Sequence, residues 1–203
     1  MIDLIYPVGE SAPLLPSTAE VAASFANRTG DDSEVLPEIF PVVQEDGTVI
    51  ARATREYCHG GSRLLHPVVH LHLIDRQERI YLQKRSMKKD LQPGKWDTAV
   101  GGHVMYGESI LEALHRESFE ELNLTDYNPI YLGCYTYDTG RDMEFVNIFA
   151  AVGHFNVKPD HDEVDQGKWL SFAQVDTMAA KKQLTPNFQS EFAQIRSQLL
   201  ALL

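Results

Sequence analysis

The chain has few cysteines, no long apolar run and no recognisable leader. Cys58 and Cys134 are its two cysteines, so at most one disulfide could form, and free thiols fit better without secretory features. No apolar run reaches the roughly 18 residues that span a bilayer. Residues 1–11 also lack the basic start and apolar stretch of a signal peptide. We therefore expect a cytoplasmic protein with no membrane partner.

Basic residues are also scarce. The 203 residues include 18 Lys and Arg against 29 Asp and Glu, which gives a formal net charge of −11. Nucleic acids and anionic membranes carry dense negative charge and repel such a chain as a whole. We expect no nucleic-acid partner, and a small anion would need a local basic site.

Length and composition favour one domain with an added arm. A chain of 203 residues with 43% hydrophobic residues can bury one sizeable core but hardly two. Residues 1–36 contain six acidic residues and one basic residue, and we predict a peripheral N-terminal arm there with a short helix at Ser17–Ala26. Residues 37–203 are predicted to form the domain.

Alternating side chains predict a β-sheet. Asp46-Gly47 between two β-rich runs, residues 38–43 and 48–51, is a hairpin signal because Asp-Gly tolerates the positive φ of tight turns. In the run 64–74, His70 and His72 alternate with leucines, as hydrogen-bonded residues on one face of a strand would. Further strands are expected at residues 80–83, 130–137, 144–154 and 167–171, with helices at 109–122 and 187–202. This order favours an α/β fold, a mixed sheet with helices on both faces.

Three glutamates of the clearest predicted helix share one face. Glu117, Glu120 and Glu121 lie at positions i, i+3 and i+4, within reach of a common point. Crowded carboxylates need compensation, and a hard divalent cation supplies it while also binding phosphate oxygens. Arg116 could orient one of these acids by a bidentate ion pair. A solvated acidic face is the alternative that spacing alone leaves open.

The glycine loop before this helix completes a longer pattern. Its fixed positions are Gly102, Glu108, Arg116, Glu117, Glu120, Glu121 and Leu124. Their spacing resembles the Nudix box, and every charged position of the box is matched. Two residues depart from it: Ser118 stands in place of an aliphatic residue and Asn123 in place of a glycine. Neither change removes a metal ligand, and Asn tolerates the left-handed conformation.

The resemblance implies both a fold and a reaction. The fold is the Nudix α/β/α sandwich with a mixed β-sheet, here preceded by the β-hairpin and the short N-terminal arm. The reaction is hydrolysis of a diphosphate with Mg²⁺ or Mn²⁺ as cofactor, in which Glu117, Glu120 and Glu121 bind the metal and Glu108 assists. The general base is Glu120 or Glu163, because its position varies within the family.

A second set of residues lies outside the box. It matches by position the metal-binding and diphosphate-binding residues of isopentenyl-diphosphate isomerases, which share the Nudix fold: His59, His66, His103, Asp142, Glu144, Arg85 and Lys89. The histidines and acids are expected to form either a second metal site, for Zn²⁺ or Mn²⁺, or a substrate pocket. Arg85 and Lys89 are expected to bind the diphosphate. They belong to a basic patch that could otherwise be a solvated surface loop: Lys84, Arg85, Lys88, Lys89 and Lys95.

Gly101 stands where the isomerases have their essential cysteine, next to the Gly102-His103 pair. Glycine has no thiol to move a proton, so the complete box favours a hydrolase. An isomerase-like enzyme and a non-catalytic diphosphate-binding module remain the alternatives. The expected partner is a small-molecule diphosphate substrate. A homodimer is left open, and no motif names the group attached to the diphosphate.

Overall fold

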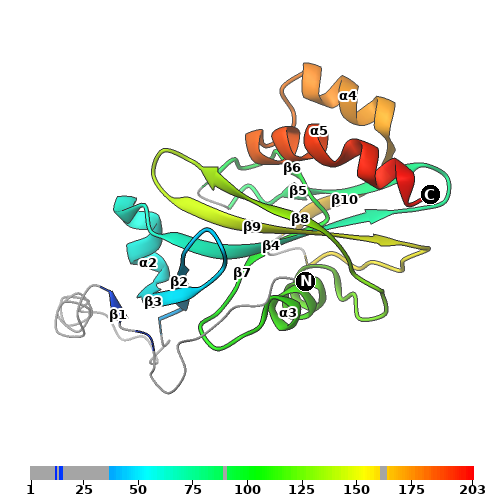
Figure 1. Ribbon diagram of the computed structural model, residues 1–203. Coiled ribbons are helices and arrows are strands. Elements are labelled where there is room, and N and C mark those ends of the chain that lie inside the picture. The colour runs from blue at the N-terminus through cyan, green and yellow to red at the C-terminus, as the bar shows by residue number, and fades with distance from the viewer. Residues whose placement is uncertain (1–11, 13, 16–36, 89–90, 161–163) are drawn as a thin grey trace. The chain divides into compact units, whose positions relative to one another are not determined.

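The computed structural model describes residues 12, 14–15, 37–88, 91–160 and 164–203, drawn in chain order in Figure 1. The predicted helix at Ser17–Ala26 lies outside this part of the chain, as do Lys89 and Glu163. The boundary between an arm and a domain at residue 36 therefore stays a prediction.

The described residues fall into two compact units. The first comprises residues up to Val68, His103–Ala113 and Tyr135–Val146, and the second comprises Val69–Gly102, Leu114–Cys134 and Asn147–Leu203. The chain passes between the units inside five elements: β4 (Leu65–Ile74), β7 (Val100–His103), α3 (Ile110–Leu122), β8 (Ile130–Asp138) and β9 (Met143–Val152). Each unit is thus assembled from several separated segments.

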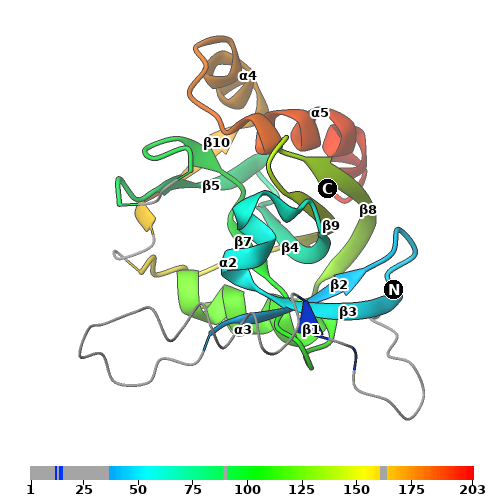
Figure 2. The same ribbon diagram turned by 90° about the vertical axis from the view of Figure 1, so that its left-hand side faces the viewer.

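The first unit contains the hairpin that the Asp-Gly signal predicted. β2 (Ile39–Val43) and β3 (Val49–Thr54) pair in the antiparallel sense. Gly47 has a φ of 83° in the turn between them. β1 (Leu14–Leu15) pairs with β3 in the parallel sense and lies beside it in Figure 2.

A short helical segment follows the hairpin. α2 (Arg55–Tyr57) is capped by the side chain of Thr54 and leads into a π-helical turn, η1 (Cys58–Ser62). The buried cluster of this region consists of Phe40, Val42, Ala51, Ala53 and Cys58. Helical turn and hairpin therefore share one core, which fixes where residues 58–62 lie relative to β2.

The larger sheet is built on β4 and β5 (Arg79–Arg85). These two strands pair in the antiparallel sense with Ile74 opposite Ile80, as the predicted second hairpin requires. β5 also pairs in the antiparallel sense with β10 (Val164–Ser171) and with β6 (Trp96–Asp97). The strand order is β10-β5-β4-β9-β8, with β6 joined to β5 and β7 joined to β4.

One face of the sheet in the second unit meets the C-terminal helix. Successive residues of a strand point to opposite faces, so His70 and His72 share a face with Ile74 and with its partner Ile80. On that face Glu191 of α5 (Pro186–Ala201) lies 2.8 Å from His70 Nδ1 and 2.6 Å from His72 Nε2. The two histidines are therefore hydrogen-bonded residues of one sheet face, as predicted.

The opposite face of the same strands meets α3. Gln83 of β5 is an odd number of residues from Ile80 and so points away from α5. Its side-chain amide donates to Glu121 of α3 at 3.0 Å. α5 thus contacts one face of the sheet at β4, and the second-unit part of α3 contacts the opposite face at β5.

The sequence did not predict α4 (Phe172–Ala180). Its start is nevertheless marked by a capping box between Ser171 and Gln174. α5 begins as predicted, with Thr185 as N-cap and a proline in its first turn. Arg196 of α5 lies 2.6 Å from Asp176 of α4, and the two helices lie side by side in Figures 1 and 2.

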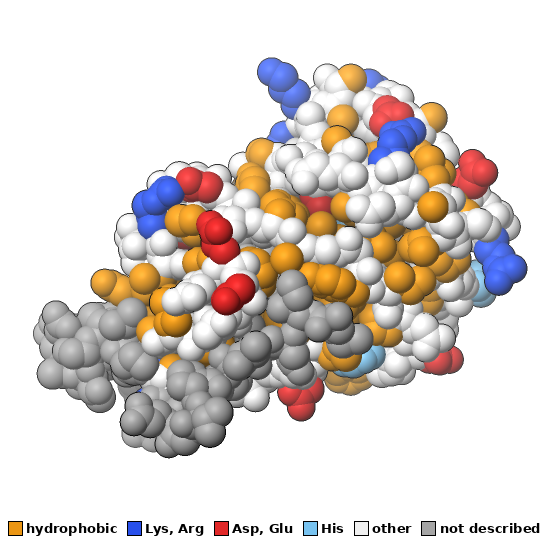
Figure 3. All heavy atoms as spheres, viewed as in Figure 1, with side chains coloured by type: hydrophobic (Ala, Val, Ile, Leu, Met, Phe, Trp, Pro, Cys, Tyr) orange, Lys and Arg blue, Asp and Glu red, His pale blue; other side chains and the backbone are white. Residues whose placement is uncertain are grey.

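No helix among the described residues is long and apolar enough to cross a membrane. Figure 3 shows one face of the molecule, on which hydrophobic and uncharged side chains are mixed. The Lys and Arg side chains of described residues stand apart from one another on that face. They do not form a continuous basic patch in the part of the chain drawn in colour there.

Candidate active site

Helix α3 is defined by local signals at both ends. Ser109 and Glu112 form the predicted capping box: the Ser109 amide donates to the Glu112 carboxylate at 2.8 Å, and the Glu112 amide donates to the Ser109 hydroxyl at 3.3 Å. Asn123 has a φ of 50°, the left-handed conformation predicted for it. The Leu124 amide then donates to the Ser118 carbonyl and closes the helix.

Ser118, which departs from the box pattern, is fully buried. Its hydroxyl donates to the Leu114 carbonyl at 2.7 Å and lies 2.8 Å from the Tyr127 hydroxyl. Burial raises the pKa of Tyr127, so the phenol stays protonated. The polar replacement therefore has its hydrogen bonds satisfied and leaves the helix intact.

Arg116 holds two of the three glutamates. Its Nη1 lies 2.7 Å from Glu117 Oε1 and 3.0 Å from Glu120 Oε2. The Glu117 side chain is 14% exposed and that of Glu120 is 53% exposed. Because the guanidinium lies between two carboxylates, it offsets part of their mutual repulsion and orients both.

Gly102 has no side chain where Glu117 needs space. An ideal Cβ on Gly102 would lie 1.9 Å from the carboxyl carbon of Glu117 and 2.3 Å from each of its oxygens. No pair of non-bonded atoms approaches so closely. The glycine is therefore a steric requirement for the observed position of the Glu117 carboxylate.

Glu121 is the most buried of the three glutamates, at 6% exposure. Its Oε2 accepts hydrogen bonds from Gln83 Nε2 at 3.0 Å and from the Gly101 amide at 3.2 Å. Two donors thus fix the carboxylate where the glycine loop meets the helix. Glu117, Glu120 and Glu121 all offer carboxylate oxygens, the ligand type that Mg²⁺ and Mn²⁺ prefer. That the three together hold one cation stays a prediction.

Glu108, the fourth acid of the pattern, belongs to the first unit. Its Oε2 accepts from the Met105 amide at 2.9 Å, and its own amide donates to the Met105 carbonyl at 3.0 Å. The carboxylate therefore closes the turn that precedes α3. Its predicted assistance to the metal stays a prediction.

Arg85 is held by its neighbours in the second unit. Its Nε donates to the Leu91 carbonyl at 3.1 Å, and its Nη1 lies 3.4 Å from Asp97. Arg85 follows Gln83 by two residues on β5 and so points to the face on which Gln83 meets Glu121. The guanidinium is therefore on the face of the sheet that carries the box carboxylates.

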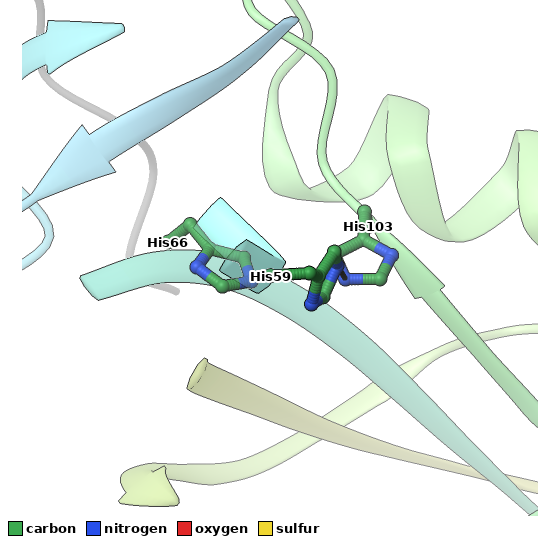
Figure 4. Close-up of side chains that lie close together, drawn as sticks. All are labelled: His59, His66 and His103. Atoms are coloured by element: carbon green, nitrogen blue, oxygen red, sulfur yellow. Dashed lines mark hydrogen bonds between the residues drawn. The ribbon is translucent and has the colours of Figure 1, made fainter. Parts of the chain in front are cut away.

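Three histidines converge in the first unit, from three different elements (Figure 4). His59 comes from η1, His66 from β4 and His103 from β7. One ring nitrogen from each lies within 4.8 Å of the other two. The His103 ring stacks on Phe40 with centroids 4.5 Å apart, which fixes its plane. The sequence pattern located these residues, and the fold brings them together.

His66 presents a buried nitrogen that lacks a hydrogen-bond partner. Its Nδ1 lies 2.9 Å from the Leu64 carbonyl and so donates, which leaves Nε2 as a buried lone pair without a partner. Burial lowers the pKa of His66 to about 4, so the ring is neutral near pH 7. An unsatisfied buried acceptor is costly, and a bound cation would satisfy it. The trio therefore fits a metal that accepts nitrogen ligands, such as Zn²⁺ or Mn²⁺.

Asp142 lies behind His59. His59 Nδ1 is 2.5 Å from Asp142 Oδ2, and His59 Nε2 is 3.1 Å from His103 Nε2. Burial raises the pKa of Asp142, but hydrogen bonds from Thr139 and His59 outweigh it and keep the pKa below its ordinary value. A carboxylate in this place orients the imidazole, as outer partners of metal-binding histidines do. Glu144 follows on β9 and is partly exposed.

Comparison with known proteins decides the family. The family model of the NUDIX domain matches residues 64–189, more than half of the chain. The chain belongs to the Nudix family.

Relatives of this Nudix chain include both isomerases and hydrolases. Isopentenyl-diphosphate Delta-isomerase of Streptomyces griseus is 29% identical over 175 residues, which cover 83% of this chain and 85% of the isomerase. The uncharacterized Nudix hydrolase YfcD of Salmonella typhi is 31% identical over 130 residues, which cover 64% of this chain and 70% of the hydrolase. Sequence similarity alone therefore does not choose between the two activities.

Solved Nudix structures share the fold. DR0079 from Deinococcus radiodurans matches with a TM-score of 0.60 at 23% identity, covering 73% of this chain and 92% of DR0079. The NUDIX domain of Shewanella oneidensis NrtR, complexed with ADP ribose, matches with a TM-score of 0.56 at 19% identity, covering 66% of this chain and 87% of that domain. The predicted Nudix α/β/α sandwich with a mixed β-sheet is confirmed.

Gly101 distinguishes this Nudix chain from the isomerase pattern. A Cβ at Gly101 would lie 3.5 Å from His70 Cδ2 and from Thr98 Cγ2, which is ordinary van der Waals contact. The position thus has room for a β-carbon and carries none. Cys58 and Cys134 are both free, and burial raises the pKa of Cys58 to about 12, so its sulfur is a thiol.

Sequence reasoning did not single out Gln83, Glu191, Thr139 or Phe40 as site residues. Their roles depend on contacts between residues distant in sequence: Gln83 contacts Glu121 across 38 positions, and Thr139 donates to Asp142, which contacts His59 across 83 positions. No local spacing marks such partners. They become visible only once the Nudix sheet is assembled.

The two glycines of the loop provide a matched pair of variants. We expect Gly102→Ala to displace Glu117 and lower kcat by roughly tenfold, because misplacing a catalytic group by about 1 Å is costly. Gly101→Ala should keep nearly normal activity, since its Cβ would meet its neighbours only at ordinary van der Waals distances. Steady-state kinetics on both variants check this. Equal activities would show that the contact with Glu117 has no part in the reaction.

Proposed function

We propose that this Nudix chain is a metal-dependent hydrolase that cleaves a diphosphate linkage in a nucleoside-diphosphate derivative or another small diphosphate. The observation that carries the proposal is the way in which the box acids of α3 lie against Gly101 and Gly102. Glu117 lies against Gly102, and Glu121 accepts a hydrogen bond from the amide of Gly101. A chain that only bound its ligand would not need every charged residue of the box.

Each box residue has a role in the proposed reaction. Glu117, Glu120 and Glu121 would hold Mg²⁺ or Mn²⁺ with assistance from Glu108, and the bound cation would neutralise charge that builds up on the phosphate oxygens. We assign Glu120 as the general base, because its side chain is 53% exposed and so can reach water. Arg116 positions Glu117 and Glu120. Glu163 remains the other candidate base.

Arg85 and Lys89 are proposed to bind the diphosphate. Arg85 is on the face of β5 that carries Gln83, whose amide contacts Glu121, and its side chain is 27% exposed. A guanidinium matches phosphate oxygens in geometry and charge. Its ion pair with Asp97, at 3.4 Å, is long and exchangeable for a substrate phosphate.

The proposed partner and compartment follow from the reaction and from the two cysteines. A small-molecule diphosphate is the partner, and the free thiols of Cys58 and Cys134 fit a reducing compartment such as the cytoplasm. The structure of the NrtR domain complexed with ADP ribose makes ADP-ribose a suitable first compound to test.

The test is a screen of diphosphates with and without metal. We expect hydrolysis of at least one nucleoside-diphosphate derivative, sugar diphosphate or prenyl diphosphate when Mg²⁺ or Mn²⁺ is added, and none in the presence of a chelator. The reason is that three adjacent carboxylates repel a diphosphate unless a cation lies between them. Release of phosphate or nucleotide is measured. Turnover that persists without metal would contradict the proposal.

An isomerase-like activity is the second candidate. It is favoured by the histidine trio with its buried, unpartnered His66 Nε2 and by the 29% identity to the Streptomyces isomerase. Under this candidate His59, His66 and His103 would hold a second cation, with Asp142 orienting His59 and Glu144 able to exchange a proton with substrate. Moving a double bond needs a proton delivered to one carbon and removed from another. Because Gly101 stands where the isomerases have their cysteine, one of the two groups that would transfer these protons is missing.

We therefore expect no useful interconversion of isopentenyl and dimethylallyl diphosphate. The protein is incubated with isopentenyl diphosphate in heavy water, and deuterium incorporation is followed by NMR. Rapid incorporation at the allylic carbon would overturn the hydrolase assignment. Gly101→Cys, whose Cβ would meet only ordinary van der Waals contacts, asks whether the remaining residues form an isomerase site. Activity gained in that variant would show that only the thiol is missing.

A further inference from the structure

A groove in the second unit gathers lysines from three segments. Lys84 comes from β5, Lys95 from the turn before β6, and Lys182 from the connection between α4 and α5. Two adjoining cavities, both widely open to solvent and of about 350 and 570 Å³, share Lys95 and Lys182. The smaller, first cavity is also lined by Pro93 and Gly94, and the larger, second cavity runs along the first turns of α5.

The walls of this groove are fixed by backbone hydrogen bonds. The Trp96 amide donates to the Gln183 carbonyl at 2.9 Å, and the Thr185 amide donates to the Trp96 carbonyl at 2.9 Å. Lys95 Nζ donates to the carbonyl of Lys182, which joins the two loops. Two of the three ammonium-bearing segments are therefore held together before any ligand arrives, so little ordering cost remains for binding.

The charge of the groove is opposite to that of the chain. Among the described residues that line the two cavities there are three lysines and no Asp or Glu. The chain as a whole has a formal net charge of −11. Three positive side chains without a lining carboxylate leave a local positive potential, which attracts a compact multivalent anion.

This groove is separate from the box carboxylates. Lys84 is an even number of residues from Ile80, so it points to the α5 face of β5, whereas Gln83 points to the face that contacts Glu121. The sheet lies between them. An anion among these lysines would not be the diphosphate held by the carboxylates.

The second cavity is uncharged away from the lysines. Its α5 wall carries Pro186 and Ala193 together with the polar side chains of Gln189 and Ser190, and Leu184 lines it just before the helix. We propose that the groove is a second ligand site for a phosphorylated organic small molecule. Its phosphate lies among Lys84, Lys95 and Lys182, and its uncharged part lies along α5. The site needs no metal and does not depend on the proposed hydrolase activity.

Isothermal titration in the presence of a chelator tests this site. Adenosine 5′-monophosphate serves as the probe, with adenosine and inorganic phosphate as comparisons. We expect the monophosphate to bind more tightly than either fragment, since it alone uses both parts of the groove. No binding of the monophosphate, or binding no tighter than that of a fragment, overturns the proposal.

Matched variants locate the binding. Lys95→Gln and Lys182→Gln should each raise the Kd by about threefold to tenfold, as loss of one charged contact to phosphate does. Lys181→Gln changes the neighbouring exposed lysine outside the groove and should leave the Kd unchanged. Similarly, Ala193→Glu on the α5 wall should weaken binding, whereas Gln198→Glu, exposed further along the helix, should not. Equal Kd values in the groove variants and their controls would place the ligand elsewhere.

Discussion

Replacing Glu121 by glutamine is expected to lower kcat for diphosphate hydrolysis by on the order of 10²-fold or more. Glutamine has the same shape and can still accept the hydrogen bond from the Gly101 amide, so the fold should be kept. What is lost is the negative charge of the most buried box acid. The metal concentration needed for half-maximal activity should rise at the same time, because one anionic ligand is removed.

Glu112→Gln is the matched control for this variant. It makes the same chemical change on the same helix and removes the same charge, but Glu112 belongs to the capping box, where glutamine also serves. Near-normal kcat is expected there. If the two variants retained similar activity, the three glutamates would be a solvated acidic face after all.

Removing the carboxylate of Glu191 is expected to destabilise the protein by about 2–5 kcal/mol, the range for breaking a buried pair or leaving buried polar groups unpaired. Glu191 is fully buried and contacts His70 Nδ1 at 2.8 Å and His72 Nε2 at 2.6 Å. In Glu191→Ala both imidazoles lose this acceptor, and α5 loses its polar link to β4. Urea unfolding followed by circular dichroism measures the change.

Two further α5 variants make this result specific. Gln198→Ala alters an exposed residue of the same helix and should change stability by less than about 0.5 kcal/mol. Glu191→Gln keeps the shape of the side chain, and its loss of stability should fall between those of the other two variants. A loss in Glu191→Ala no larger than in Gln198→Ala would mean that packing alone holds α5 to the sheet.

The same carboxylate predicts a pH dependence. Burial raises the pKa of Glu191, but the charge and hydrogen bonds of His70 and His72 outweigh it, so its pKa lies well below the ordinary 4.5. A group with a depressed pKa stabilises the fold fully above its unfolded pKa, and this contribution is lost as pH falls through the folded value. The wild type should therefore lose more stability than Glu191→Gln on acidification below about pH 4.5. Parallel pH profiles would contradict the assignment.

Local signals in the sequence account for most of the fold that could be predicted. Asp46-Gly47 marked the first hairpin, and Thr185-Pro186 marked the start of α5, because turns and caps depend on only a few adjacent residues. α4 was missed although Ser171 and Gln174 form a capping box. A cap without a clear apolar stripe behind it is a weak signal in sequence.

Residues of the candidate site could be predicted only where the helix period or the resemblance to the family indicated them. The shared face of Glu117, Glu120 and Glu121 follows from the helix period, and the histidine trio was found by resemblance. The contact between Glu191 and His72 spans 119 positions and has no local signature. The same holds for the space that Gly102 leaves for Glu117, which depends on how β7 approaches α3.

The length of strand β7 matters to two sets of site residues at once. It carries Gly101 and Gly102, which lie against Glu121 and Glu117, and then His103 of the histidine trio. Because a one-residue slip changes the register of a strand, deleting or inserting one residue there would shift the Gly101 amide, the space at Gly102 and the His103 ring at once. A change in the length of this strand would therefore disturb both sets of residues together. A substitution at one of these positions acts on one set of residues alone, whereas the gain or loss of a residue acts on both sets.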